Sequence, residues 1–401
     1  MLWQPGLPPR YTQMKDPDLT AAIGAVRARL GGALVILGHH YQQDEVIQFA
    51  DFTGDSFKLS QLAAERVNEG GAKYVVFCGV HFMAESADIL TPDETVVVLP
   101  DLSAGCSMAD MADYEDTVDA WEQTQNLFRA RYGSRSRTRV VPICYMNCSA
   151  AIKAFCGEHG GAVCTSSNCR RVFEWALAGG AEPKAVDEQI KVLFLPDQHL
   201  GRNTAASMGF DVRADMCLWD PKSPDDLGGG EETALDHSTF ILWKGHCSVH
   251  MLFRPEHVDQ IRADWPDVTV IVHPECSHEV VQRADMTGST EGIKKVIEEA
   301  APGSRWAVGT EVHMVHRMAE EAAKRGVTVR MLSDCQCLCT TMYRIDMPHL
   351  LWTLDHLSDC QIVNQIRVDA RVRHWALIAL NRMLELTGRG GLNASSQAIA
   401  S

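Results

Sequence analysis

The chain has 401 residues, of which 46% are hydrophobic and 22% are charged. These proportions are typical of a folded globular protein and exclude a disordered chain of low hydrophobicity. With 37 lysine and arginine residues against 52 aspartate and glutamate residues, the formal net charge is −15. The chain as a whole therefore repels nucleic acid and anionic membranes, so an anionic ligand must be bound by the local features of a site.

No segment approaches the roughly 20 consecutive apolar residues that a membrane span needs, and the first residues, MLWQPGLPPRYTQMKD, lack the order of a secretory signal. We therefore expect a cytoplasmic protein with no membrane segment. The 14 cysteines do not follow the short, even spacings of a small disulfide-linked scaffold. In a reducing compartment such cysteines are core residues, nucleophiles or metal ligands.

Apolar segments of strand length recur along the chain, with helical segments between them. The predicted strands are 33–38, 74–79, 95–100, 139–145, 191–196, 240–243, 268–274, 305–310 and 327–332. The predicted helices are 44–50, 56–69, 86–90, 149–156, 169–178 and 290–300, and two more helical segments follow Met347. Continuous Val, Ile and Leu segments that alternate with helices are typical of parallel strands buried on both faces. The sequence thus predicts an α/β fold.

Two segments depart from this pattern. RARYGSRSRTR, which ends at Arg139, is strongly basic, and residues 220–237 are acidic and rich in proline and glycine. Charge-rich segments of this kind are usually solvated, so we interpret both as surface loops. The acidic character of the whole chain disfavours a nucleic-acid role for the arginines.

Polar residues gather where the predicted strands end, which is where open α/β sheets bind ligands. Gly54–Asp55–Ser56 and Gly288–Ser289–Thr290 precede predicted helices, so they could be simple N-caps or could bind a phosphate or carboxylate through free N–H groups. Taken singly, Cys106 or Cys247 is more often a small buried core residue, but both follow strands in glycine-containing turns, where a core residue is less expected. The alternating cysteines of DCQCLCTTM suggest metal or redox chemistry, although the second CxxC of a zinc site is absent.

Ten motifs, in order over residues 30–355, resemble the quinolinate synthase family, the A protein of NAD biosynthesis. They are LGHHYQQDEVIQFADFTGDS, PDLSAGCSMADM, CYMNCSAAIKA, CTSSN, LPDQHLG, WKGHCSVH, VHPECSHEV, ADMTGSTEGI, VGTE and CTTMYRI. The resemblance implies three similar three-layer α/β units with short parallel sheets around a pseudo-threefold axis, and an active site where the units meet. The expected divisions are residues 1–110, 111–248 and 249–345 for the three units and 346–401 for C-terminal helices and a tail. Residues 113–139 and 217–237 are then insertions in the second unit.

The resemblance also implies a 4Fe-4S cluster that takes one cysteine from each unit. By motif, the ligands are Cys106 in AGCSMAD, Cys247 in KGHCSVH and Cys339 in CTTM. Three ligands for four irons leave one iron open, which is what a Lewis acid needs. Cys335 and Cys337, beside the third ligand, could form a reversible disulfide or remain two thiols.

The reaction that the resemblance implies condenses iminoaspartate with dihydroxyacetone phosphate to quinolinate, with loss of phosphate and two waters and no net redox change. The implied substrate-binding residues are His39, Tyr41, Ser56, Tyr145, Asn147, Ser166, His250, His273, Glu275, Ser289 and Thr290. Glu275 is the candidate general base, and His39, Tyr41 and His273 are further candidates for proton transfer. An L-aspartate oxidase, which would hand over the unstable imine, is the partner that the resemblance suggests.

Two other function classes use part of the same residues. A zinc-dependent α/β lyase could use His250, His273 and Glu275, but it leaves the cysteines in glycine-containing turns unexplained. An iron–sulfur electron-transfer protein normally supplies its ligands in a short local run such as CxxxCxxC, and the sequence has none. Both interpretations remain alternatives at this point.

Overall fold

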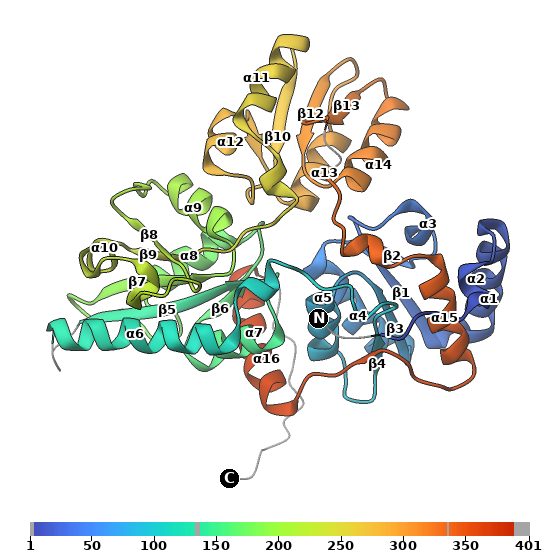
Figure 1. The fold of residues 1–401 in the computed structure, drawn as a ribbon, viewed down its shortest axis with the longest axis horizontal. Coiled ribbons are helices and arrows are strands. Elements are labelled where there is room, and N and C mark those ends of the chain that lie inside the picture. Colours follow the sequence, from blue (N-terminus) through green and yellow to red (C-terminus); the bar gives the residue numbers. More distant parts are fainter. Residues whose placement is uncertain (1–3, 133–136, 335–336, 389–401) are drawn as a thin grey trace.

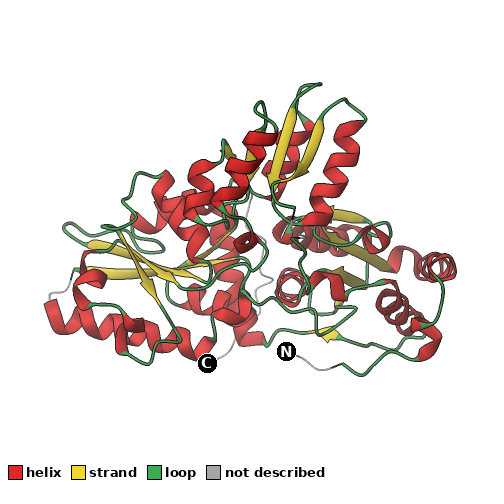
Figure 2. Cartoon of the chain, turned by 45° about the horizontal axis from the view of Figure 1, so that its top comes forward, coloured by secondary structure: helices red, strands yellow, loops and turns green. Residues whose placement is uncertain are grey.

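The computed structural model describes residues 4–132, 137–334 and 337–388. Three sheets lie around a common centre, each in its own α/β unit (Figure 1). Helices flank the strands of each unit on both sides (Figure 2). The predicted fold class, three α/β units with short parallel sheets followed by C-terminal helices, is confirmed. None of the helices in the described part of the chain has both the length and the apolar character needed to cross a bilayer.

The first unit holds a five-stranded sheet of order β14-β4-β3-β1-β2. Its strands are β1 (Leu34–His39), β2 (Phe52–Gly54), β3 (Tyr74–Cys78), β4 (Val96–Val98) and β14 (Gln365–Ile366). Its helices are α1 (Pro9–Thr12), α2 (Asp16–Leu30), α3 (Asp44–Ile47), α4 (Ser56–Gly70) and α5 (His81–Leu90). All six residues of β1 are buried, as expected for a central parallel strand covered on both faces. Among the described strands of this sheet, only β14 runs antiparallel to its neighbour.

The second unit holds a five-stranded parallel sheet of order β6-β5-β7-β9-β8. Its strands are β5 (Thr138–Tyr145), β6 (Ala162–Cys164), β7 (Gln189–Leu195), β8 (Met216–Trp219) and β9 (Phe240–Trp243). Its helices are α6 (Tyr114–Tyr132), α7 (Ala150–Glu158), α8 (Cys169–Leu177), α9 (Gln198–Ser207) and α10 (Glu232–His237). The long pairing of β5 with β7 places Cys144 opposite Leu195 and brings both strand ends to the centre of the molecule.

The third unit holds a four-stranded parallel sheet of order β11-β10-β12-β13. Its strands are β10 (Thr269–Val272), β11 (Met286–Thr287), β12 (Arg305–Gly309) and β13 (Thr328–Met331). Its helices are α11 (Pro255–Asp264), α12 (His278–Arg283), α13 (Thr290–Glu298) and α14 (Val312–Ala323). Ile271 and Val308 pair at the centre of this sheet and are fully buried.

After the third unit the chain returns to the other two. Helix α15 (Met347–Ser358) packs against α2 of the first unit, and α16 (Ala370–Leu386) packs against α7 of the second. The α7–α16 contact needs a glycine, because a Cβ atom on Gly157 would lie 2.0 Å from the carbonyl oxygen of Trp375. The expected division of the chain at residues 110, 248 and 345 stays a prediction.

The prediction that the basic and acidic segments are surface loops is wrong in part. Arg129 and Arg131 lie on helix α6, and the acidic segment includes helix α10. Helix α6 contacts the acidic segment, because Arg131 pairs with Asp236 at 3.3 Å and the side chain of Gln123 accepts a hydrogen bond from the amide of Leu227 at 2.6 Å. The charged residues of α6 are exposed, whereas Ala120 and Phe128 on its other side are buried. The many charged residues made this segment look like a solvated loop in the sequence. Arg135 lies outside the described residues.

Candidate active site

A cavity of about 700 Å³, including its open mouth, lies where the three units meet. Most of the residues that the sequence predicted for the site line it. They are His39, Tyr41, Ser56, Cys106, Tyr145, Asn147, Ser166, Cys247, His273, Glu275, Thr290 and Cys339. The described lining residues include no lysine and no arginine. An anion in this cavity therefore depends on hydroxyl, amide, imidazole and backbone N–H groups, or on a bound cation.

The topology explains why these residues meet. His39 ends β1, Tyr145 ends β5 and His273 follows β10, so all three lie at the carboxyl ends of parallel strands. Ser56 and Thr290 are the first residues of α4 and α13, so the N-termini of two helices from different units also face the cavity. These helix ends offer free N–H groups and the positive end of a helix dipole.

The three predicted cysteine ligands come from three separate parts of the fold. Cys106 follows β4, Cys247 follows β9, and Cys339 follows β13. The turn before Cys247 requires a glycine, because a Cβ atom on Gly245 would lie 2.3 Å from the carbonyl oxygen of Pro196. The structure therefore brings the three thiols to one cavity although they are far apart in the sequence.

Burial sets the protonation of these thiols. It raises the pKa of Cys106 to about 12, and it also raises the pKa of Cys247 and of Cys339. Without a nearby cation the three side chains are therefore neutral, and a bound metal would remove their protons. Soft sulfur donors that converge from three sides fit an iron–sulfur cluster better than a hard divalent cation.

Glu275 is buried at the centre of a hydrogen-bond network. The hydroxyl of Tyr145 donates to its Oε1 atom at 2.6 Å, and Nδ1 of His250 lies 2.9 Å from its Oε2 atom. The rings of His250 and His273 stack with their centroids 4.5 Å apart. Burial alone raises the pKa of the Glu275 carboxyl, but the two imidazoles and the hydrogen bonds from His250 and Tyr145 outweigh it and lower the pKa. The carboxylate is therefore held ionised.

Thr310, which the sequence reasoning did not select, joins two of the predicted residues. Its hydroxyl lies 2.8 Å from the hydroxyl of Tyr41 in the first unit and 3.2 Å from Nε2 of His250 in the third. Thr310 directly follows β12, and it lies in the VGTE motif. Its position after a strand was visible in the sequence, but its role as a link between two units was not.

Asp197 was also missed, although it lies in the LPDQHLG motif. Its side chain is fully buried, and Oδ1 accepts a hydrogen bond from the amide of Leu200 at the start of α9. Its Oδ2 atom has no hydrogen-bond partner among the described residues. Burial raises the pKa of this carboxyl, and the nearby Glu275 raises it further. Burial and the charge of Glu275 therefore both favour the protonated form of Asp197.

Two predicted site residues lie behind the cavity lining. Ser289 is the N-cap of α13, and its hydroxyl accepts a hydrogen bond from the amide of Gly292 at 3.2 Å. His250 is not among the lining residues, but it contacts three of the groups that hold the site together, through hydrogen bonds to Glu275 and Thr310 and by stacking on His273. Cys337 is buried. Cys335 lies outside the described residues, so the disulfide suggested between these two cysteines stays a prediction.

In the TSSN motif the structure separates the two serines. Ser166 lines the cavity, whereas the hydroxyl of Ser167 lies 2.9 Å from the hydroxyl of Thr165. The prediction of Ser166 as the residue that faces the site therefore agrees with its position. Whether it contacts substrate stays a prediction.

One group of side chains has the spacing of a simple metal site. Ligand atoms of Cys247, His250 and Glu275 all lie within 4.8 Å of one another, and this is the only such group of His, Cys, Asp and Glu within the described ranges. It differs from the predicted zinc set by containing Cys247 in place of His273.

Comparison with known proteins identifies the family. Residues 22–385 match the family model described as "Quinolinate synthetase A protein". The chain belongs to this family. The resemblance inferred from the ten motifs is thereby confirmed, and the chain is an enzyme of the quinolinate synthase family of NAD biosynthesis.

Relatives in this family match over almost their full length. The chain is 53% identical to the quinolinate synthase of Acidobacterium capsulatum over 379 residues, which is 94% of this chain and 95% of the relative. It is 52% identical to that of a Nocardioides species over 377 residues, covering 93% and 91% of the two chains. It is 46% identical to that of Bacillus anthracis over 379 residues, covering 94% and 96%.

Proposed function

We propose that the chain condenses iminoaspartate with dihydroxyacetone phosphate to form quinolinate, releasing phosphate and two waters. The observation that carries the proposal is one central cavity, lined by three cysteines together with Glu275 and groups that can hold anions, in a member of the quinolinate synthase family. The reaction involves no net redox change. It needs sites for two carboxylates and a phosphate, a base, and help for departing hydroxide.

The cofactor that fits the three cysteines is a 4Fe-4S cluster held by Cys106, Cys247 and Cys339. When bound, this cluster supplies a Lewis acid through the iron that has no protein ligand. The cavity around the cysteines is lined by residues of all three units, so binding of the cluster depends on the assembled molecule. The remaining chemistry falls to the side chains of the chain itself.

Substrate anions would be held without lysine or arginine. Ser56 and Thr290 present their hydroxyls and the adjacent free N–H groups at the starts of α4 and α13, which suits a phosphate or carboxylate. Asn147 and Ser166 line the part of the cavity that the second unit contributes, and they can donate hydrogen bonds to a second anionic group of the substrates. Because the chain carries a net charge of −15, these local donors must offset an unfavourable overall field.

Proton transfer would centre on Glu275. Its carboxylate is ionised, lines the cavity and is oriented by Tyr145 and His250, so it can take a proton from a substrate carbon or nitrogen next to it. Burial lowers the pKa of His39 and that of His273 to about 3, so both imidazoles are neutral at physiological pH and can accept or donate hydrogen bonds. Tyr41 would help to close the site through its bond to Thr310.

A zinc-dependent lyase is the second candidate, because Cys247, His250 and Glu275 have metal-site spacing. A single zinc ion on these residues would leave Cys106 and Cys339 without a role. The iron–sulfur proposal uses all three cysteines and leaves His250 and Glu275 for substrate chemistry.

The decisive experiment starts from protein purified without oxygen. Iron, acid-labile sulfide and zinc would be measured per chain, and the protein would then be incubated with oxaloacetate, ammonium and dihydroxyacetone phosphate. We expect about four irons and four sulfides, and formation of quinolinate. Zinc in place of iron, or a full iron–sulfur content without quinolinate, would overturn the proposal. We also propose that the protein works in the cytoplasm and takes its imine from an L-aspartate oxidase. Replacing oxaloacetate and ammonium by aspartate and this oxidase, with quinolinate as the readout, tests that partner.

A further inference from the structure

Two side chains reach from one unit into the next and bind the backbone on both sides of a cavity residue. Asn203, on α9 of the second unit, binds the loop of the third unit that carries Glu275. Arg317, on α14 of the third unit, binds the loop of the first unit that carries Tyr41. Neither residue is among those that line the cavity.

The contact of Asn203 surrounds Glu275. Its Nδ2 atom donates to the carbonyl oxygens of Pro274 and Cys276, each at 2.9 Å. Two carbonyl acceptors on one side require the NH₂ group there, so Oδ1 is left to accept from Nδ1 of His278 at 2.8 Å. Asn203 is buried, and each end of its amide has a partner in the third unit.

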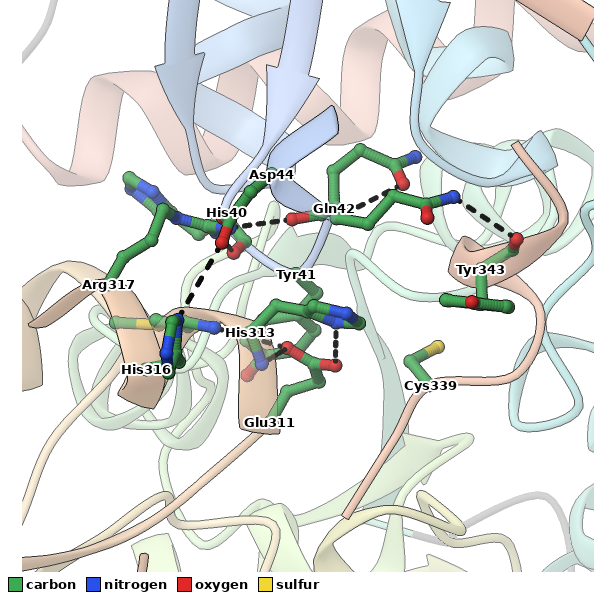
Figure 3. Close-up of polar contacts among 12 residues, drawn as sticks. His40, Tyr41, Gln42, Asp44, Glu311, His313, His316, Arg317, Cys339 and Tyr343 are labelled. Carbon is green, nitrogen blue, oxygen red and sulfur yellow. Dashed lines mark hydrogen bonds and ion pairs between the residues drawn. The ribbon is translucent and has the colours of Figure 1, made fainter. Parts of the chain in front are cut away.

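The contact of Arg317 surrounds Tyr41 in the same way. Its guanidinium donates to the carbonyl oxygen of His40 and, at 2.8 Å, to that of Gln42, and it also pairs with Asp44 at 2.6 Å. Figure 3 shows Arg317 beside His40, Gln42 and Asp44, with Tyr41 on the same loop. The planar fork of arginine can bind two carbonyls and a carboxylate at once, which the single ammonium of lysine cannot do with the same geometry.

We propose that Asn203 and Arg317 are positioning residues that hold Glu275 and Tyr41 at the reacting centre across the unit boundaries. Both act on main-chain carbonyls, so they fix the path of each loop whatever side chains the loop carries. The catalytic consequence rests on the proposed function, because it assumes that Glu275 and Tyr41 act on substrate. A shift of about 1 Å in such groups can cost about a hundredfold in rate.

Arginine variants test the first-unit loop. In Arg317→Lys and Arg317→Met we expect kcat to fall about tenfold to a hundredfold, with KM changed by less than about threefold. The matched control is Arg325→Met, because Arg325 donates to two carbonyls, those of Ile297 and Glu298, that belong to its own unit. We expect this control to keep its kcat. Full activity in Arg317→Lys would show that positive charge, and not the two-carbonyl contact, is what matters, and would overturn the proposal.

Amide variants test the third-unit loop. Asn203→Asp is nearly isosteric but faces the two carbonyls with an acceptor, so we expect the same selective fall in kcat. The matched control is Gln198→Glu on the same helix, whose side chain accepts a hydrogen bond from Arg202 of its own helix. Equal losses in the two variants would overturn the assignment of Asn203.

Hydrogen exchange of the folded variants gives a readout that needs no activity. We expect faster exchange in residues 38–46 for Arg317→Met and in residues 273–278 for Asn203→Asp, and wild-type exchange in these loops for both controls. If the wild-type protein forms no quinolinate, the proposed function fails, but these exchange differences still test the two contacts. Unchanged exchange in both loops would overturn the proposal whatever the activity.

Discussion

His39 and His273 are neutral because they are buried, and the same burial keeps the three cavity cysteines protonated in the absence of a metal. Glu275 stays ionised in the same surroundings because Tyr145 and His250 donate to its two oxygens. The protonation of each group thus depends on its burial and on its individual partners. Replacing one atom, sulfur by oxygen in a cysteine or oxygen by nitrogen in Glu275, tests these assignments.

Changing Cys106, Cys247 or Cys339 singly to serine should abolish retention of the cluster, because a hydroxyl is a poor substitute for a thiolate on iron. Iron per chain after anaerobic reconstitution is the measurement. Cys217→Ser is the matched control, since its sulfur lies outside the cavity and donates to the carbonyl of Phe240, and a hydroxyl can do the same. Full iron content in Cys339→Ser would move the third ligand to Cys337 or Cys335.

Glu275→Gln should keep the cluster and bind substrate, but lose turnover by about a hundredfold or more. The amide oxygen can still accept the hydrogen bond from Tyr145, but the side chain can no longer take a proton. Steady-state kinetics would show the loss in kcat with a small change in KM. Glu279→Gln, an exposed carboxyl on α12, is the control. A near-normal rate in Glu275→Gln would remove Glu275 as the base and direct attention to His273 or His39.

At the scale of the element, the start of α13 shows how neighbouring residues divide two tasks. Ser289 caps the helix through the amide of Gly292, and its neighbour Thr290 is buried against the cavity. The sequence motif Gly288–Ser289–Thr290 indicated both a cap and an anion site without separating them. The structure assigns the cap to Ser289 and places Thr290 in the lining of the cavity, where its side chain hydrogen-bonds Tyr41.

Two substitutions at this helix start should therefore affect different properties, one the stability of the protein and the other its substrate affinity. Ser289→Ala should lower the free energy of unfolding by about 1 kcal/mol and leave substrate affinity nearly unchanged. Thr290→Val should weaken apparent substrate affinity about tenfold to a hundredfold with little change in stability, because it removes a donor to a charged group. Urea unfolding and steady-state kinetics of both variants are the measurements. Weaker affinity in Ser289→Ala, with normal affinity in Thr290→Val, would reverse the assignment.

At the scale of the whole molecule, the C-terminal segment ties the first two units together. The chain leaves the third unit, adds α15 and β14 to the first unit, and then places α16 against α7 of the second. The two red helices at the end of the chain in Figure 1 lie against different units. Because the cavity takes residues from all three units, this return path helps to fix the geometry of the site.

Glycine substitutions test how tightly α16 is docked. Gly157→Ala should destabilise the second unit, because the new Cβ atom would collide with the backbone at Trp375, and limited proteolysis should then cut near α16. Gly24→Ala, within helix α2, is the matched control, since nothing lies within 4 Å of the added Cβ atom. That change should stabilise the protein by about 0.5 to 1 kcal/mol. Equal thermal midpoints for the two variants would contradict the tight α7–α16 contact.

The sequence by itself determined the fold class and the strands of the sheet interiors. All nine predicted strands are present. Eight of them are interior strands, and a strand buried on both faces needs a continuous apolar segment that can be recognised without knowledge of its neighbours; the ninth, β13, is an edge strand. The five strands that were not predicted, β2, β6, β8, β11 and β14, have two to four residues each and lie at sheet edges. A segment this short gives no periodicity that separates a strand from a loop or a helix end, so only pairing with a neighbour defines it.

The ten motifs likewise contain the three cysteines and most of the other residues that line the cavity. What only the tertiary structure decided are the contacts between units. Thr310, Asp197, Asn203 and Arg317 acquire their roles from partners distant in the sequence; Asn203 lies 71 residues from Pro274, and Arg317 lies 275 residues from Gln42. Side-chain contacts over such separations leave no local periodicity, because they depend on how packed units meet and not on the order of residues along one helix or strand.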